Sequence, residues 1–287
     1  MQRQLVIHAD DLGLSPGVNA GILSAIQKGV VTSTSLMVNF PATAEALVSV
    51  KRHSLDVGWH VNLVQGRPLT PPACIPSLVD SRGNFLSPRV FFQKALLRRL
   101  NPQEVRLELQ TQRRVFLEAG LFPSHVDGHL HIHAMPGVAP VLREILREQP
   151  IPFVRGPRES GGPGRGRFLS RAFLAFLRAS HGSYWRETGC ESLPFYGLSL
   201  SRSADSLPAW KKLLERISEP RAEVMVHPAL EKAEGPTRSY GKQQNRQAEH
   251  DRLVSPELRE LIQNAGFRLV SFRDLVPKIF LSDRHDL

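Results

Sequence analysis

The sequence is organised around the stretch His125-Val126-Asp127-Gly128-His129-Leu130-His131-Ile132-His133, which holds four of the protein's eleven histidines and one carboxylate. In a continuous strand all five ionisable side chains would lie on one face, because successive side chains alternate. Five polar groups are too many for a core, and Gly128 is unfavourable inside a strand. We therefore expect the strand to end near Asp127, with His129 just beyond it at the mouth of a pocket. A lone histidine is usually a structural residue, but this clustering predicts a divalent-metal site.

A second group of polar residues lies near the start of the chain. Residues 5–9 form a short apolar run typical of a buried strand, and Asp10-Asp11-Leu12-Gly13 follows directly. Adjacent carboxylates at a strand end point in different directions, so one can bind a metal while the other acts on water. Ser15 and Pro16 then predict the cap and first position of a helix of about a dozen residues.

The rest of the chain alternates between strand and helix patterns. Further strands are expected over residues 30–38, 56–63, 151–155, 195–200, 223–227 and 268–272, giving about eight with the two above. Helices are expected over residues 42–51, 90–100, 102–119 and 137–148. This alternation favours a parallel α/β sheet, open or closed into a barrel. His60 and His227 end two of these strands, at the edge where barrels build active sites.

Length and composition predict one domain over residues 1–287, with two unusual segments. A basic, apolar, insertion-like segment near 159–185 contains a helix pattern over 168–178, which either packs on the sheet or lies on a membrane. A loop near 231–250 lacks periodicity. Residues 64–88 are rich in proline and glycine and predict a long functional loop.

The net charge of +10 suggests acidic partners, but no nucleic-acid motif accompanies it. Only Cys74 and Cys190 occur, which argues against a disulfide framework or a cysteine metal site. No signal peptide or apolar stretch of about twenty residues is evident. We expect a cytoplasmic protein, with peripheral contact at the inner membrane and a homodimer as further expectations.

These residues suggest a hydrolytic site. One carboxylate and two imidazoles make an open metal site, and such an ion lowers the pKa of bound water and polarises a carbonyl. The other aspartate can act as general base, and His227 is placed to donate a proton to a leaving amine. Arg155 could orient the base or bind substrate, or could form a surface ion pair. His125 and Asp127 are further candidates for binding substrate or orienting the base.

Four segments resemble the YdjC family of carbohydrate deacetylases, also called the ChbG/HpnK family. They are residues 9–19 (Ala-Asp-Asp-Leu-Gly-Leu-Ser-Pro-Gly-Val-Asn), Gly58-Trp59-His60, residues 125–129 and residues 223–228. The resemblance extends over about residues 3–155 and 195–275. Trp59 stands where a smaller aliphatic residue is usual, and Ala229 stands where glycine is common.

The resemblance implies a (β/α) barrel-like fold that is distorted or has fewer than eight strands. It implies that Asp11, His60 and His129 hold Mg²⁺ or Zn²⁺ and that Asp10 is the base. The implied reaction removes the N-acetyl group from an N-acetylglucosamine-type sugar, either an oligosaccharide or a glycolipid such as a hopanoid conjugate.

Two alternatives come from other classes. The pairs His129/His131 and His131/His133 suggest another metal-dependent amidohydrolase or a phosphoesterase, although in amidohydrolases such a pair occupies the first strand. The chain could also be a non-catalytic glycan- or membrane-binding protein. The presence of both Asp10 and Asp11 argues against binding alone, which does not need a second carboxylate beside a metal ligand.

Overall fold

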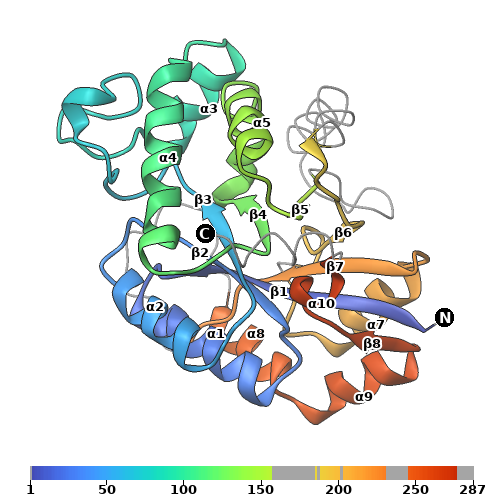
Figure 1. Cartoon of the computed structure of the whole chain (residues 1–287). Helices are drawn as coiled ribbons and strands as arrows, with labels where there is room; N and C mark the ends of the chain where they lie inside the picture. Colours follow the sequence, from blue (N-terminus) through green and yellow to red (C-terminus); the bar gives the residue numbers. More distant parts are fainter. Residues whose placement is uncertain (1, 157–184, 186–187, 201–202, 231–244, 277–287) are drawn as a thin grey trace.

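The computed structural model describes residues 2–156, 185, 188–200, 203–230 and 245–276 (Figure 1). Within these ranges eight strands form one parallel sheet. They are β1 (Arg3–Leu12), β2 (Ser33–Leu36), β3 (Val57–Val61), β4 (His125–Gly128), β5 (Phe153–Val154), β6 (Phe195–Tyr196), β7 (Arg221–Val226) and β8 (Phe267–Leu269). Each lies within or overlaps a strand expected from the sequence.

Seven of the strands follow one another around a curled sheet in the order β5-β4-β3-β2-β1-β7-β6, and β8 pairs with the first residues of β1. A parallel bridge between Phe153 and Glu191 links β5 to the chain just before β6, so the two edges of the sheet approach each other there. The result is a distorted (β/α) barrel-like fold, as expected, with helices around the outside (Figure 1).

Helices connect the strands and cover the outer face of the sheet. They are α1 (Pro16–Lys28), α2 (Thr43–Arg52), α3 (Pro88–Leu96), α4 (Pro102–Glu118), α5 (Ala139–Glu148), α7 (Leu207–Arg216), α8 (Arg246–Leu253), α9 (Pro256–Asn264) and α10 (Phe272–Leu275), with 3-10 turns η1 (Pro72–Cys74) and η2 (His129–Ala134). As predicted, Ser15 caps α1 by accepting a hydrogen bond from the backbone N–H of Val18. In the described chain no helix is both long and apolar enough to cross a membrane.

The inside of the barrel changes from apolar to polar along the strands. Alternation on β1 places Val6, His8 and Asp10 on one face. Val6 belongs to a buried apolar cluster at the amino-terminal end of the interior, which we call the barrel floor: Val6, Phe153, Leu193, Val270, Phe272 and Val276. The next two positions on β1 bring ionisable groups above this floor, so the polar site lies toward the carboxyl ends of the strands.

Two segments differ from the expected elements. The last strand ends at Leu269 rather than continuing to Phe272, because Ser271 and Asp274 form a capping box that starts α10. The long loop contains η1 and is fixed to α4, since the backbone N–H groups of Leu69 and Thr70 donate to the buried carboxylate of Glu108. The expected helix over 168–178 lies outside the described residues, as does most of the loop near 231–250. The single-domain organisation stays a prediction.

Candidate metal centre and active site

The carboxyl end of β1 is irregular, and this irregularity separates two neighbouring carboxylates. The pairing of β1 with β2 shifts register between Ala9 and Leu12, and Asp11 has a φ of 74°. A left-handed conformation is unusual for a residue other than glycine, and a bulge changes the direction of a side chain. Asp10 therefore stays on the inward face with His8, while Asp11 turns toward the histidines of β3 and η2.

Asp11, His60 and His129 form a cluster whose ligand atoms all lie within 4.8 Å of one another. Asp11 Oδ1 lies 3.0 Å from His129 Nδ1 and 3.4 Å from His60 Nε2. These separations fit ligands that share an ion at about 2.1 Å. All three side chains are buried. The residues selected by the family resemblance are thus brought together.

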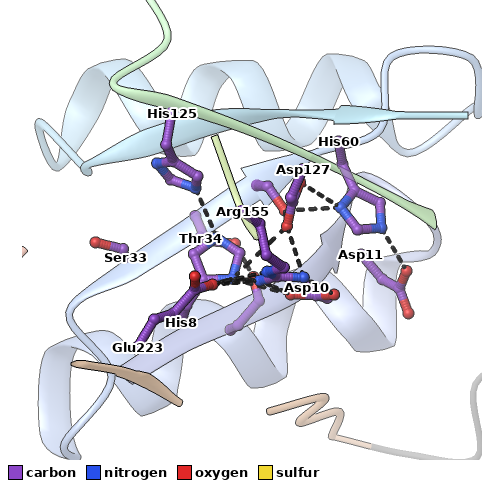
Figure 2. A network of polar contacts seen from close by, with 12 residues as sticks. His8, Asp10, Asp11, Ser33, Thr34, His60, His125, Asp127, Arg155 and Glu223 are labelled. Carbon is purple, nitrogen blue, oxygen red and sulfur yellow. Dashed lines mark hydrogen bonds and ion pairs between the residues drawn. The ribbon is translucent and has the colours of Figure 1, made fainter. Parts of the chain in front are cut away.

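The surroundings of His60 fit a metal ligand. Its Nδ1–H donates to Asp127 Oδ1 over 2.8 Å (Figure 2). Ser35 Oγ donates to the other oxygen of this carboxylate. Metal-binding histidines usually donate their second N–H to a carboxylate in this way. Among the described residues no hydrogen-bond partner reaches His60 Nε2, which lies 3.4 Å from Asp11 Oδ1. A buried ring nitrogen without a hydrogen-bond partner, beside a carboxylate, is a suitable ligand atom for a divalent cation.

The cluster attracts positive charge. Burial alone would lower the pKa of His60, but Asp127 and Asp11 raise it to about 10. Burial would raise the pKa of Asp11, yet Arg246 and His129 hold it well below its usual range. A cation that uses His60 Nε2 must displace the proton that these carboxylates favour.

Arg155 binds and orients the carboxylate of Asp10. It follows β5, is 2% exposed and forms a two-point ion pair with Asp10, with both N–O distances 2.8 Å. It also donates to Glu223 Oε1 over 2.8 Å and lies 2.9 Å from Asp127 Oδ2 (Figure 2). Burial would raise the pKa of Asp10, but Arg155 holds it well below its usual range. Of the roles considered for Arg155, this geometry matches orientation of the carboxylate, and burial excludes a surface ion pair.

A second set of potential metal ligands consists of His8, Asp10 and Asp127. The Arg155 guanidinium lies within 2.9 Å of an atom of each of these three side chains. A permanent cation therefore already occupies the space between them. Within the described chain this leaves the cluster of Asp11, His60 and His129 as the candidate metal centre.

His227 follows β7 and lies beside Asp10, with 3.9 Å between His227 Nε2 and Asp10 Oδ2. Its backbone N–H donates to the buried carboxylate of Glu249 over 2.9 Å. Burial lowers the pKa of His227 to about 4, although Asp10 and Asp11 act in the opposite direction. The ring is therefore neutral at pH 7.

The remaining histidines of the central stretch do not join the metal cluster. Leu130 and His131 have left-handed φ values of 53° and 58°, which turn the chain sharply after His129. His133 Nε2–H donates to the carbonyl oxygen of Arg155 over 3.0 Å. Burial lowers the pKa of His131 to about 3 and that of His133 to about 4. Neither His131 nor His133 belongs to a group of three potential metal ligands in the described chain, so the His-x-His pairs give no support to the amidohydrolase or phosphoesterase alternative.

Four site residues were not identified from the sequence. His8 and Glu223 lie on strands and face the barrel interior, where strand alternation could have placed them. Arg246, whose Nη2 donates to Asp11 Oδ2 over 2.6 Å, and Glu249 lie on α8, within the segment near 231–250 that was expected to be a loop. No sequence signal pointed to these two.

Glu249 gives a testable dependence of stability on pH. Burial raises its pKa from 4.5 to about 7, so the folded protein retains a proton that the unfolded chain has lost. The free energy of unfolding therefore falls as pH rises between these values, by roughly 2–3 kcal/mol. Glu249→Gln still accepts the His227 N–H and should be more stable than the wild type at pH 8 but similar at pH 5 by chemical denaturation. The exposed control Glu260→Gln should match the wild type at both pH values, and an equal gain in both variants would contradict this account.

A curled parallel sheet with a His–His–Asp cluster at the carboxyl ends of its strands defines a barrel-like α/β protein with a candidate metal centre. The chain belongs to the YdjC-like family, whose model, described as YdjC-like protein, matches residues 4–264. It is 34% identical to a carbohydrate deacetylase of Brevibacillus brevis, over 95% of this chain and 99% of that protein. It is 33% identical to a human carbohydrate deacetylase, over 96% of this chain and 92% of that one.

Two further proteins resemble the chain over nearly its whole length. The chain is 31% identical to a chitooligosaccharide deacetylase of Yersinia enterocolitica, over 96% of this chain and all of that protein. The crystal structure of a putative cellobiose-phosphate cleavage protein from Enterococcus faecalis superposes with a TM-score of 0.74 at 25% identity, covering 96% of this chain and 100% of that one. The family resemblance inferred from the sequence motifs is confirmed.

Proposed function

We propose that this protein is a metal-dependent carbohydrate N-deacetylase that hydrolyses the acetamide of an N-acetylglucosamine-type sugar. The observation that carries the proposal is the Asp11–His60–His129 cluster beside an aspartate that is held by a buried arginine. The relatives named carbohydrate deacetylase and chitooligosaccharide deacetylase support it. A protein that only bound glycans would need no such pair of differently oriented carboxylates.

Asp11, His60 and His129 would hold the ion, which when bound would polarise the acetamide carbonyl and lower the pKa of water. Asp127 orients His60, and Arg246 orients Asp11. Two nitrogens and one oxygen suit Zn²⁺ or another transition metal better than Mg²⁺, which prefers oxygen ligands. We therefore favour zinc.

Asp10 would act as the general base. Arg155 keeps this carboxylate ionised, and its two-point contact fixes the plane of the group. Oδ2 accepts one hydrogen bond from Arg155 Nη1, which leaves a second lone pair on the side of His227. That lone pair can take a proton from the attacking water.

His227 would pass this proton to the leaving amine. Because its ring is neutral at pH 7, it can donate only after it has received a proton. Asp10 Oδ2, at 3.9 Å from His227 Nε2, is the nearby source, within reach of a small movement or one bridging water. One water proton thus reaches the sugar nitrogen as the C–N bond breaks, while the water oxygen and its other hydrogen stay on the acetyl carbon as acetic acid.

His227→Ala tests this transfer. The variant should hydrolyse an N-acetyl sugar about 10²–10⁴ times more slowly, because an amide nitrogen leaves poorly without protonation. An acetate ester with a good leaving group needs no such proton, so its hydrolysis should slow far less. Steady-state rates on both substrates provide the measurement. An equal loss on the two would assign His227 to substrate binding or structure.

The proposed activity is tested by acetate release from a panel of free N-acetylglucosamine, chitin oligosaccharides of two to four units and an N-acetylglucosaminyl lipid. Metal-stripped protein should be inactive, and Zn²⁺ should restore activity more than Mg²⁺. Preference within the panel would separate an oligosaccharide enzyme from one acting on a glycolipid such as a hopanoid conjugate. Sugar binding without acetate release under any metal would favour the non-catalytic alternative. The helix pattern over 168–178, for which membrane contact was one of two alternatives, lies outside the described residues, and homodimer formation stays a prediction.

A further inference from the structure

We infer that Arg246 has a role beyond the orientation of Asp11: its Nη1 binds the acetyl oxygen of the substrate, which gains negative charge when water attacks. The ligand of this nitrogen is thus an anionic oxygen on an acetyl-sized group. The inference deepens the proposed function and rests on it. Its first test measures the binding of an anion and needs no turnover, so its failure is distinguishable from failure of the proposed activity.

Two arginines contact the aspartates of the site, and they differ in their free hydrogen-bond donors. Arg155 uses all three guanidinium nitrogens, since Nε donates to Glu223 Oε1 while Nη1 and Nη2 donate to the two oxygens of Asp10 (Figure 2). Arg246 Nη2 donates to Asp11 Oδ2 over 2.6 Å, but Nη1 is buried and has no hydrogen-bond partner within the described chain. Of the two residues, Arg246 therefore keeps a charged donor for a ligand.

A buried guanidinium nitrogen without an acceptor calls for a physical explanation. The guanidinium is always charged, and its N–H groups are donors that cannot be switched off by losing a proton. Buried polar groups without partners are uncommon in folded proteins and occur at catalytic positions and ion sites. His60 Nε2, the proposed metal-ligand atom, is likewise buried without a hydrogen-bond partner among the described residues. This shared property favours a ligand at Nη1 as well.

Arg246 lies beside the place where the acetyl group would react. Its guanidinium is planar, so Nη1 is held next to Nη2 and close to Asp11, whose other oxygen faces His60 and His129. Arg246 also acts on His227. Burial is the main cause that lowers the pKa of His227 to about 4, and the charge of Arg246 contributes. One guanidinium thus lies near both the candidate metal centre and the proposed acid.

The first turn of α8 fixes Arg246 in this position. The carbonyl oxygen of Arg246 accepts a hydrogen bond over 3.1 Å from the N–H of Ala229, two residues after His227. Further along the same turn, Glu249 accepts the backbone N–H of His227 over 2.9 Å. The helix is therefore tied to the chain that follows β7. A donor held in this way needs little reorganisation when charge develops on a substrate.

A charged donor suits the acetyl oxygen better than a sugar hydroxyl. When the water oxygen bonds to the acetyl carbon, the electron pair of the C=O double bond moves to the acetyl oxygen, and it returns when the C–N bond breaks. Hydrogen bonds between charged groups are stronger than those to neutral groups, so the guanidinium stabilises this stage more than the neutral acetamide. A sugar hydroxyl gains no such charge.

The first test is calorimetric binding of methylphosphonate, which has the methyl group and tetrahedral shape of the hydrated acetyl group, to Zn²⁺-loaded protein. Arg246→Lys keeps a cation beside Asp11 but lacks the second nitrogen. At saturating Zn²⁺ it should bind methylphosphonate about 10- to 100-fold more weakly than the wild type, as expected for loss of a charged hydrogen bond. The matched control Arg268→Lys, at an exposed position of β8, should bind like the wild type. Equal affinity in Arg246→Lys and the wild type, or no binding by the wild type, would overturn the inference.

A second comparison separates this role from the orientation of Asp11. Arg246→Met removes both nitrogens and should also weaken metal affinity, measured by titration of metal-free protein with Zn²⁺. Asp127→Asn alters the partner of His60 and should weaken metal affinity as well. At saturating Zn²⁺, Asp127→Asn should recover the wild-type affinity for methylphosphonate, whereas Arg246→Met should not. Recovery in both variants would show that Arg246 acts only through Asp11, and circular dichroism would establish that each variant is folded.

Kinetics on an N-acetyl sugar provide the third readout. Arg246→Lys should lower kcat by about 10²–10³ at saturating Zn²⁺, as is typical when a donor to a developing oxyanion is removed, with little change in KM. A rise in KM with unchanged kcat would contradict the role, because it would assign Arg246 to binding of the uncharged substrate. If no sugar is hydrolysed by the wild type, the methylphosphonate result still decides whether Arg246 binds an acetyl-sized anion.

Discussion

His60→Ala should lose the bound divalent ion and, with it, nearly all acetate release. The substitution removes Nε2, one of three protein ligands in the candidate centre, and leaves Asp127 without its imidazole partner. Asp11→Ala and His129→Ala should behave in the same way. Metal content per chain, measured by elemental analysis after dialysis against metal-free buffer, is the primary readout, and activity is the second.

A surface histidine provides the control for these variants. His53 lies in the exposed turn after α2, and His53→Ala should keep the metal content and activity of the wild type. Circular dichroism would establish that each variant is folded. Wild-type metal content in all three ligand variants would contradict the assignment of the centre, whatever their activity.

Asp10→Asn should keep the metal and lose turnover. Asparagine has nearly the same shape, but it cannot take a proton from water at neutral pH, so kcat should fall by about 10²–10⁴. Arg155 retains Asp127 and Glu223 as partners, which limits the effect on folding. Steady-state kinetics at saturating metal, together with metal analysis, would measure both properties.

A comparison of Asp127→Asn with Asp10→Asn distinguishes weaker metal binding from loss of the general base. It alters the partner of His60 and should weaken metal affinity by about 10- to 100-fold, as is usual when such a partner is removed. Excess metal should therefore restore much of its activity, whereas it should not restore Asp10→Asn. If added metal rescued Asp10→Asn as well, Asp10 would belong to the metal centre rather than act as the base.

The fold was largely predictable because apolar runs with polar ends mark buried parallel strands. The run before Asp10 and the one before His227 both became central strands of the sheet. Pairings between distant segments could not be predicted in the same way. The pairing of β8 with the start of β1, for example, depends on tertiary packing. The end of β8 at Leu269 was also not predicted. The apolar run suggested a strand up to Phe272, but the capping box of Ser271 and Asp274 starts a helix there.

The site was predictable in its residue types but not in its details. The sequence correctly predicted that Asp10 and Asp11 point in different directions, but it did not show the irregularity that turns Asp11 toward the histidines, and it left four histidines as equal candidates. The left-handed turn at Leu130 and His131 selects His129 over the two histidines that follow, and no pattern in the sequence shows those φ values. The pKa of His227, which burial lowers to about 4, could not be predicted either, because a position at a strand end does not show how far the ring is buried.

The apolar floor of the barrel has a consequence for the order of events in catalysis. In the described chain, Phe153, Val270 and Phe272 pack across the amino-terminal end of the interior. Traffic of small molecules is then confined to the carboxyl ends of the strands, where the sugar also binds under the proposed function. Under the proposed function, acetate would leave on the side from which the next substrate enters, and acetate still held in the site would exclude that substrate. Accumulated acetate should thus act as a competitive product inhibitor.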